Sequence, residues 1–182
     1  ILPFYKSIIR ENIKNYKIKL KNKKTVKLKL KLAEKEIEFS GIFTENKGVN
    51  YIFIKKDSYF DRNHPYTQKK NEKGELQSTD YPDNLERYSF FSHALLKLLE
   101  KERISPDVLH CHDWQTSLIP VYMKSLYKSD AVLGGATSVL TIHNLAYQGV
   151  FPREMMEVSG LPTELFSLRD LEYYGKMNFL KG

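Results

Sequence analysis

The sequence has 182 residues, of which 41% are hydrophobic, and its formal net charge is +7. This length suffices for one sizeable domain that buries about 70% of its unfolded surface, and the hydrophobic share excludes an intrinsically disordered protein. No apolar run reaches the roughly 18 residues that a membrane-spanning helix needs. The single cysteine, Cys111, excludes an internal disulfide framework and is typical of a reducing compartment.

The two ends of the sequence predict that the chain is part of a longer protein. It opens on "ILPFYKSIIR", without an initiator methionine or a signal-peptide pattern, and it closes on "KMNFLKG", inside an apolar segment. We find no internal repeat and no clear linker. We therefore expect residues 1–182 to form a single partial domain, truncated at both ends.

Ten lysines between Lys14 and Lys35 account for much of the positive charge. They alternate with Ile, Leu and Val in "KIKL" and "VKLKLKL", a period of two that indicates strands with one buried and one charged face. The stretch has no arginine and one tyrosine, which does not favour nucleic-acid recognition. A solvated strand face is the favoured interpretation, and a non-catalytic basic binding module stays open as an alternative.

The first half of the chain predicts a β-rich lobe with hairpin connections. Strands are expected at Tyr16–Leu20, Thr25–Leu32 and Glu36–Phe43, and a fourth in "VNYIFIKK" after the turn "ENKGVN". A long polar loop, from Asp57 to Asp80, should follow.

The second half alternates helices with apolar strands. "YPDNLERYSFFSHALLKLLEKERI" predicts a helix whose apolar face repeats at helical spacing, in Leu85, Tyr88, Phe91, Leu95 and Leu98. A strand from Val108 to about Cys111, a helix over Trp114–Tyr127, a strand in "GGATSVLTIHN" and a helix "PREMMEVSG", ended by Gly160, come next. This order predicts an α/β fold with a parallel sheet flanked by helices, beside the lysine-rich β-hairpin region.

Two polar clusters, "HCHDW" and "HNLAYQG", fall at the carboxyl ends of these predicted strands, where such sheets bind their ligands. Alternation places His110 and His112 on one strand face, with Cys111 on the other. An H-x-H pair at a strand end is compatible with a metal-dependent hydrolase, although only His143 lies at a neighbouring strand end as a third ligand. Alternatively, both histidines are hydrogen-bonded within the sheet and Asp113 caps the next helix.

The sequence resembles the bacterial glycogen synthases and plant starch synthases of glycosyltransferase family 5. The motifs that support the resemblance occur in the family's order and spacing across most of the chain. They are "LPFY", "YFDR" with Tyr66 after it, "YPDNLERYSFFS", "HCHDWQTSLIPVY", "TIHNLAYQGVFP" and "LEYYGKMNFLKG". Cys111 stands where alanine is common in the family, and Thr67 where glycine is usual.

The resemblance implies the Rossmann-like N-terminal domain of a GT-B glycosyltransferase, a retaining enzyme that transfers glucose from ADP-glucose to the non-reducing end of an α-1,4-glucan. A UDP-glucose preference stays open. The family's K-x-G-G-L loop and its C-terminal nucleotide-binding domain are absent, so the fragment alone should be inactive. The resemblance implies no metal and no other cofactor. Neither nucleic acid nor a membrane is expected as a partner, and a bacterial cytoplasm is the expected compartment, with a plastid as the alternative.

The resemblance also implies roles for individual residues. His143 would lie beside the reacting glucose and stabilise the positive charge at its anomeric carbon, and Asp113 would line the same cleft. Asn144 would bind sugar hydroxyls, and Tyr66 would reach into the cleft. Two further residues, Trp114 and Gln148, are weaker candidates for substrate binding, since Trp114 could simply pack the start of a helix.

Overall fold

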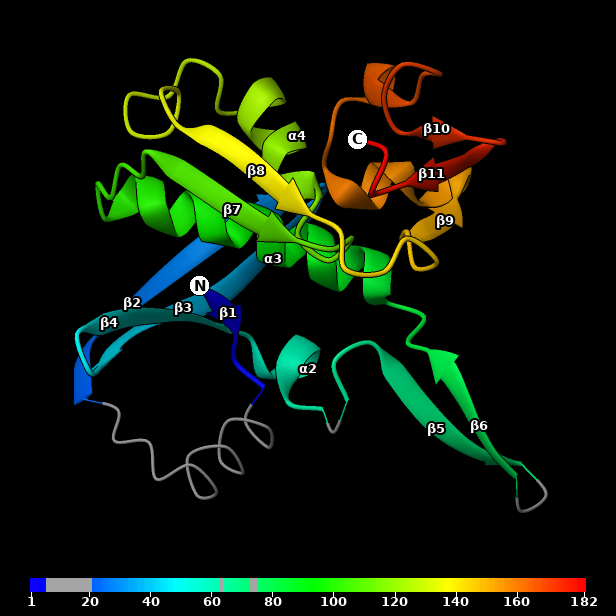
Figure 1. The fold of residues 1–182 in the computed structure, drawn as a ribbon, viewed down its shortest axis with the longest axis horizontal. Helices are drawn as coiled ribbons and strands as arrows, with labels where there is room; N and C mark the ends of the chain where they lie inside the picture. The colour runs from blue at the N-terminus through cyan, green and yellow to red at the C-terminus, as the bar shows by residue number, and fades with distance from the viewer. Residues whose placement is uncertain (6–20, 63, 73–74) are drawn as a thin grey trace. The chain divides into compact units, whose positions relative to one another are not determined.

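The computed structural model describes residues 1–5, 21–62, 64–72 and 75–182, so the strand predicted at Tyr16–Leu20 lies outside the described residues. The chain divides into two compact units (Figure 1). The first comprises Ile1–Lys29 and Ile37–Asn84, and the second comprises Leu30–Glu36 and Leu85–Gly182. Each unit is considered by itself below.

A mixed sheet of four strands dominates the first unit. Its order is β1 (Leu2–Pro3), β4 (Val49–Lys55), β3 (Lys35–Asn46) and β2 (Lys21–Leu32). The outer strand β1 runs parallel to β4, whereas β4 and β3 form an antiparallel hairpin. Its tip has positive φ at Lys47 (51°) and at Gly48 (80°). Two successive left-handed residues match the right-handed twist of the flanking strands, so "ENKGVN" forms the predicted turn.

The alternation of lysine and leucine in β2 separates its two faces as the sequence predicts. Lys27, Lys29 and Lys31 are exposed, whereas Leu30 and Leu32 are 4% and 1% exposed. Because successive side chains of a strand point to opposite faces, the lysines remain in water while the leucines enter the core. The solvated strand face is therefore confirmed for this segment.

The prediction of a long loop from Asp57 to Asp80 is wrong. A short helix, α2 (Asp57–Phe60), is followed by an antiparallel hairpin of β5 (Thr67–Glu72) and β6 (Glu75–Asp80). The sequences "TQKKNE" and "ELQSTD" are almost entirely polar. They give no apolar period of two, so backbone pairing forms these strands without the sequence signal on which strand prediction depends.

The predicted helix of the second unit is confirmed as α3 (Asn84–Lys101). All five residues of its predicted apolar face are at most 5% exposed. Phe90, Ala94 and Leu96 are also fully buried, so the helix is enclosed on more than this one face. These side chains belong to the core of the second unit.

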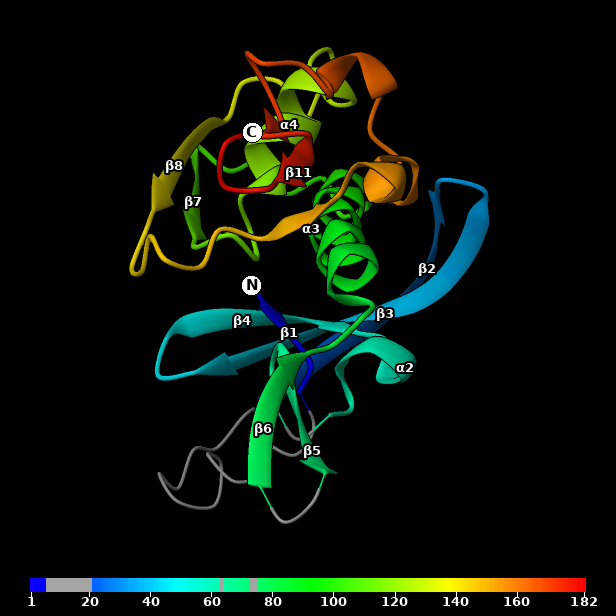
Figure 2. The same ribbon diagram turned by 90° about the vertical axis from the view of Figure 1, so that its right-hand side faces the viewer.

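Two parallel strands follow, β7 (Val108–His112) and β8 (Thr137–Thr141), joined by a crossover that contains α4 (Leu118–Ser125). Figure 2 shows α3 and α4 to one side of this strand pair. The predicted helix over Trp114–Tyr127 begins later than expected. Asp113 has a left-handed φ of 57°, and a bonded turn from Trp114 to Ser117 precedes the first residue of α4.

The last part of the chain forms a small antiparallel sheet of order β10-β11-β9. Its strands are β9 (Val150–Pro152), β10 (Glu172–Tyr173) and β11 (Lys176–Asn178). Between β9 and β10 lie two 3₁₀ helices, η1 (Arg153–Ser159) and η2 (Thr163–Leu165). The predicted helix "PREMMEVSG" is thus a 3₁₀ helix, and Gly160 ends it with a φ of 70°.

The described strands make an α/β fold with both parallel and antiparallel pairs. Parallel pairing joins β1 to β4 and β7 to β8, and these two pairs belong to different sheets. The predicted parallel Rossmann-like sheet is therefore not confirmed, because hairpins form most of the other pairings. Within the described ranges, none of the helices combines the length and apolar character needed to cross a bilayer.

Candidate functional site

The two polar clusters meet at the carboxyl ends of β7 and β8. The parallel register pairs His112 with Thr141, so the chain leaves both strands at the same edge. The backbone N–H of Asp113 donates to the carbonyl oxygen of Thr141 at 2.9 Å and extends the ladder by one step. Because this register places the ends of β7 and β8 side by side, the residues that follow them, Asp113 and His143, lie close together, as the strand order predicts.

The side chain of Asp113 binds the backbone of His143. Its Oδ1 accepts a hydrogen bond of 2.7 Å from the N–H of His143. Of the two roles left open for Asp113, the structure does not support the helix cap, since that helix begins at Leu118 and this carboxylate oxygen accepts from the residue that follows β8. This hydrogen bond holds the backbone of His143 in place and keeps the Asp113 carboxylate next to it.

Three imidazole rings form a column at this edge. The ring centroids of His110 and His112 are 4.3 Å apart, and those of His112 and His143 are 5.3 Å apart with an interplanar angle of 22°. His110 Nε2 lies 2.7 Å from the hydroxyl of Thr141, which confirms its predicted hydrogen bond within the sheet. His112 Nδ1 lies 3.0 Å from His143 Nε2, a hydrogen bond in which one ring donates and the other accepts.

Cys111 lies on the opposite strand face, as alternation predicts. It is 2% exposed, while His110 and His112 are exposed. Burial raises the pKa of its thiol to about 11, so the group is protonated at neutral pH. A protonated, buried thiol is a poor nucleophile and a poor metal ligand, which leaves Cys111 a packing role.

The hydrolase alternative needs a metal centre. In the part of the chain that the structure describes, no group of three or more His, Cys, Asp or Glu side chains is placed to hold a metal ion. The facing nitrogens of His112 and His143 bond to each other instead. The geometry gives no support to metal-assisted hydrolysis at His110 and His112.

The loop after β8 is tied down by its own amides. Asn144 Oδ1 accepts a hydrogen bond of 3.0 Å from the N–H of Ala146, which closes a local turn, and the Asn144 residue is exposed. Gln148 donates to the carbonyl of Leu145 and accepts from Asn178 Nδ2 at 2.7 Å. Both ends of Gln148 are therefore engaged within the protein, which favours a structural role.

Trp114 is a core residue in this structure. It is 5% exposed and packs against the rings of Tyr88 at 5.0 Å, Phe151 at 5.9 Å and Phe179 at 6.1 Å. These contacts match the interpretation of Trp114 as packing at the helix start. The aromatic cluster supports the turn directly behind Asp113.

Tyr66 belongs to the first unit, whereas the other five candidate residues belong to the second. The residue is 36% exposed, and its carbonyl oxygen accepts hydrogen bonds from Asn84 Nδ2 (2.9 Å) and from the N–H of Tyr81 (3.1 Å). A bidentate pair of Arg62 with Asp83 lies beside this segment and raises the pKa of Arg62 through its hydrogen bonds. The backbone that carries Tyr66 is thus held in place.

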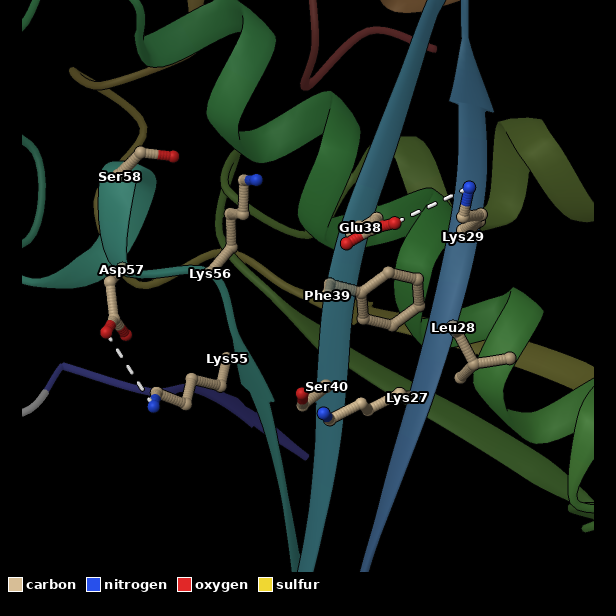
Figure 3. A pocket seen from close by; sticks show the side chains of 10 residues that line it. All are labelled: Lys27, Leu28, Lys29, Glu38, Phe39, Ser40, Lys55, Lys56, Asp57 and Ser58. Carbon is tan, nitrogen blue, oxygen red and sulfur yellow. Dashed lines mark ion pairs between the residues drawn. The ribbon is translucent and has the colours of Figure 1, made fainter.

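The first unit also has an open hollow of about 680 Å³ among the strand lysines (Figure 3). Four lysines line it, but Lys29 pairs with Glu38 at 3.4 Å and Lys55 with Asp57 at 3.7 Å. Both pairs are solvent-exposed and contribute little to stability. The mixed charge does not match the uniformly basic groove that a nucleic acid would need.

Sequence reasoning missed the contact between His112 and His143. The motif "HCHDW" suggested His112 only as a metal ligand or a sheet residue. The alternation of exposed histidines and buried Cys111 was a usable signal, but the partner of His112 depends on strand order and register.

Comparison with known proteins places this geometry in a family. A family model described as the starch synthase catalytic domain matches residues 1–182. The chain is 38% identical to a glycogen synthase of Thermodesulfovibrio yellowstonii and 39% identical to one of Geotalea daltonii, in both cases over the whole chain. It covers 36% and 35% of these proteins, so it spans about a third of the length of the relatives it matches.

A solved structure has the same fold. It is the catalytic domain of starch synthase IV from Arabidopsis thaliana bound to ADP and acarbose, with a TM-score of 0.71 and 24% sequence identity. The match covers 91% of this chain and 32% of that one. Together with the family model over the full length, these matches show that the chain belongs to the starch synthase catalytic domain family.

Proposed function

We propose that this chain is the acceptor-side part of a longer enzyme that transfers glucose from ADP-glucose to the non-reducing end of an α-1,4-glucan, retaining the anomeric configuration. The family match over residues 1–182 supports the reaction class. The relatives named glycogen synthase support glycogen or a similar glucan as the acceptor. The ADP bound to the plant structure supports an adenine nucleotide donor.

The observation on which the proposal rests is the hydrogen bond from the N–H of His143 to Asp113 Oδ1 at 2.7 Å. It unites two motif residues that are 30 positions apart in the sequence at one strand edge. Glucosyl transfer passes through an oxocarbenium-like state, so a carboxylate and an imidazole fixed beside the sugar ring lower the barrier electrostatically. His143 meets the developing positive charge, Asp113 lines the same cleft, and Asn144 offers its amide NH₂ to a sugar hydroxyl.

The rest of the enzyme supplies what this chain lacks. A second Rossmann-like domain of the GT-B type would bind most of the nucleotide and neutralise the departing diphosphate, so the chain alone is inactive. For Tyr66, which belongs to the first unit, the family resemblance alone supports a role in substrate binding. The bacterial relatives favour a bacterial cytoplasm as the compartment, with a plastid as the alternative.

The test uses the full-length protein and measures glucose incorporation into glycogen from ADP-glucose and from UDP-glucose. His143→Ala should lower kcat by about 100- to 1,000-fold, the usual cost of one lost electrostatic contact in a transition state. Lys31→Gln, on the exposed face of β2, is the matched control and should leave the rate unchanged. A folded full-length protein that transfers from neither donor would overturn the proposal.

A further inference from the structure

The ring of His143 is held by a second histidine that sequence reasoning gave no part in the reaction. Its Nε2 lies 3.0 Å from His112 Nδ1, and the two rings are nearly parallel, with an interplanar angle of 22° and centroids 5.3 Å apart. Among the described residues, His112 supplies the only hydrogen bond to the His143 ring. His143 itself is exposed and lies beyond the last paired residue of β8, so the fold offers its side chain little other restraint.

His112, by contrast, is fixed from several sides. The hydroxyl of Thr116 accepts from the N–H of His112 at 2.6 Å and donates to its carbonyl oxygen at 2.8 Å. The residue pairs with Thr141 in the ladder, and the ring of His110 lies tilted against it with the centroids 4.3 Å apart. His110 is in turn bonded to the Thr141 hydroxyl at 2.7 Å. The column is therefore rigid at its base and ends in His143.

We infer that His112 is a positioning residue that sets the orientation and the tautomer of the His143 ring. This inference rests on the proposed function for its catalytic consequence. Because Nε2 of His143 is engaged by His112, Nδ1 is the ring nitrogen that faces a ligand. The two facing nitrogens hold one proton between them, since two N–H groups at this distance would repel each other.

The hydrogen bond also restricts rotation of the ring. To present Nε2 to the sugar, His143 would have to break the bond with His112. A preorganised ring does not have to be ordered when the transition state forms, so its restraint acts on kcat more than on substrate affinity. In this respect His112 acts through His143 and does not touch the substrate.

Three variants of the full-length enzyme test the inference. His112→Leu removes the bond and should lower kcat by about 10- to 100-fold, the range seen when a reacting group is displaced by about 1 Å, with KM changed by no more than about threefold. His112→Asn places an amide where Nδ1 was and should recover kcat to within about fivefold of wild type. His110→Gln, the matched control one ring further from His143, should have the smaller effect.

A double variant and a spectrum distinguish positioning from simple packing. The double variant His112→Leu/His143→Ala should have the same kcat as His143→Ala alone. His112 acts only through the His143 ring, and that ring is already absent in His143→Ala. Nitrogen NMR of histidine-labelled protein without substrate should show a changed tautomer distribution at His143 in His112→Leu and a wild-type one in His110→Gln.

The outcomes separate the inference from the proposed function. Wild-type enzyme without transferase activity refutes the proposed function, and the NMR comparison still decides the positioning role. An active wild type in which His112→Leu has normal kcat and an unchanged His143 spectrum overturns the inference. Equal losses of kcat in His112→Leu, His112→Asn and His110→Gln would show that the three histidines serve strand packing, and would overturn the inference as well.

Discussion

Asp113 binds the backbone of His143 from a left-handed conformation: its φ is 57°, and its Oδ1 accepts the His143 N–H at 2.7 Å. Non-glycine residues adopt this conformation at a cost, and Asp and Asn do so more readily than other residues. The residue therefore combines a backbone turn, a hydrogen-bond acceptor and a negative charge at one position. These three properties can be separated by substitution.

Asp113→Asn should preserve the turn and the acceptor while it removes the charge. We expect a thermal midpoint close to wild type and, under the proposed function, a kcat lowered by about 10- to 1,000-fold, because the negative charge beside the reacting sugar is lost. Asp113→Ala should lose activity and also stability, by about 1–2 kcal/mol, since alanine tolerates the left-handed φ poorly. Kinetics and thermal unfolding of both variants check this. An Asn variant with wild-type kcat would limit Asp113 to a structural role.

Gly149 is required by the ring of Trp114. Its φ is 65°, and a Cβ there would lie 2.6 Å from Trp114 Cε3. Gly149→Ala should destabilise the protein by about 2–4 kcal/mol, through backbone strain together with overpacking against a buried ring. Gly175→Ala is the matched control. That glycine has a φ of 75° with nothing within 4 Å, so it reports the strain alone. Equal losses of unfolding free energy in both variants would contradict the role of Trp114.

The sequence predicts most of this site but not its contacts. Strand ends could be located because Val108 to Cys111 and the strand before His143 are bounded by polar residues. Parallel order then brings Asp113 and His143 to one edge. The bond between His112 and His143 could not be predicted, because it depends on a register that pairs His112 with Thr141. A shift by one residue would turn the histidine face away.

The errors in the fold have a similar origin. The polar hairpin of β5 and β6 lacks an apolar period, so it was expected to be a loop. The sequence predicts too early a start for α4 because aspartate is a common helix cap. The residue type at position 113 therefore does not reveal that its φ is left-handed and that the helix begins only at Leu118. The prediction of β2 is correct because its lysines and leucines alternate in the same order as its exposed and buried positions.

The lysine strand gives a test of that alternation. Lys31 is exposed and Leu32 is 1% exposed, although they are neighbours in β2. Lys31→Gln should change the free energy of unfolding by less than about 0.5 kcal/mol, since its contact with Glu34 is a solvated pair. Leu32→Ala should cost about 2–5 kcal/mol, as expected for a truncated core side chain. Urea unfolding measures both. A Lys31 effect as large as the Leu32 effect would reject the two-faced strand.

His93 should make the second unit sensitive to acid. Its ring stacks on Tyr122 at 4.9 Å and meets the edge of Tyr127 at 5.6 Å. Burial, and secondarily the charge of Lys97, lowers the pKa of His93 from 6.5 to about 4. The folded protein therefore keeps this ring neutral at pH values where the unfolded chain binds a proton.

The sign of the effect follows from proton binding. Stability from His93 is fully present above pH 6.5 and is lost as the pH falls toward about 4, with no further loss below. The loss over this window is about 3 kcal/mol, from the shift of the pKa. Urea unfolding of the full-length protein across these pH values, followed by hydrogen exchange in α3, should show this slope. His93→Phe should flatten it whatever its effect on absolute stability. Lys97→Met should narrow the pH range over which stability is lost, because removing the positive charge raises the pKa of His93 toward its value in the unfolded chain. An unchanged slope in His93→Phe would show that other groups govern the acid sensitivity of the unit.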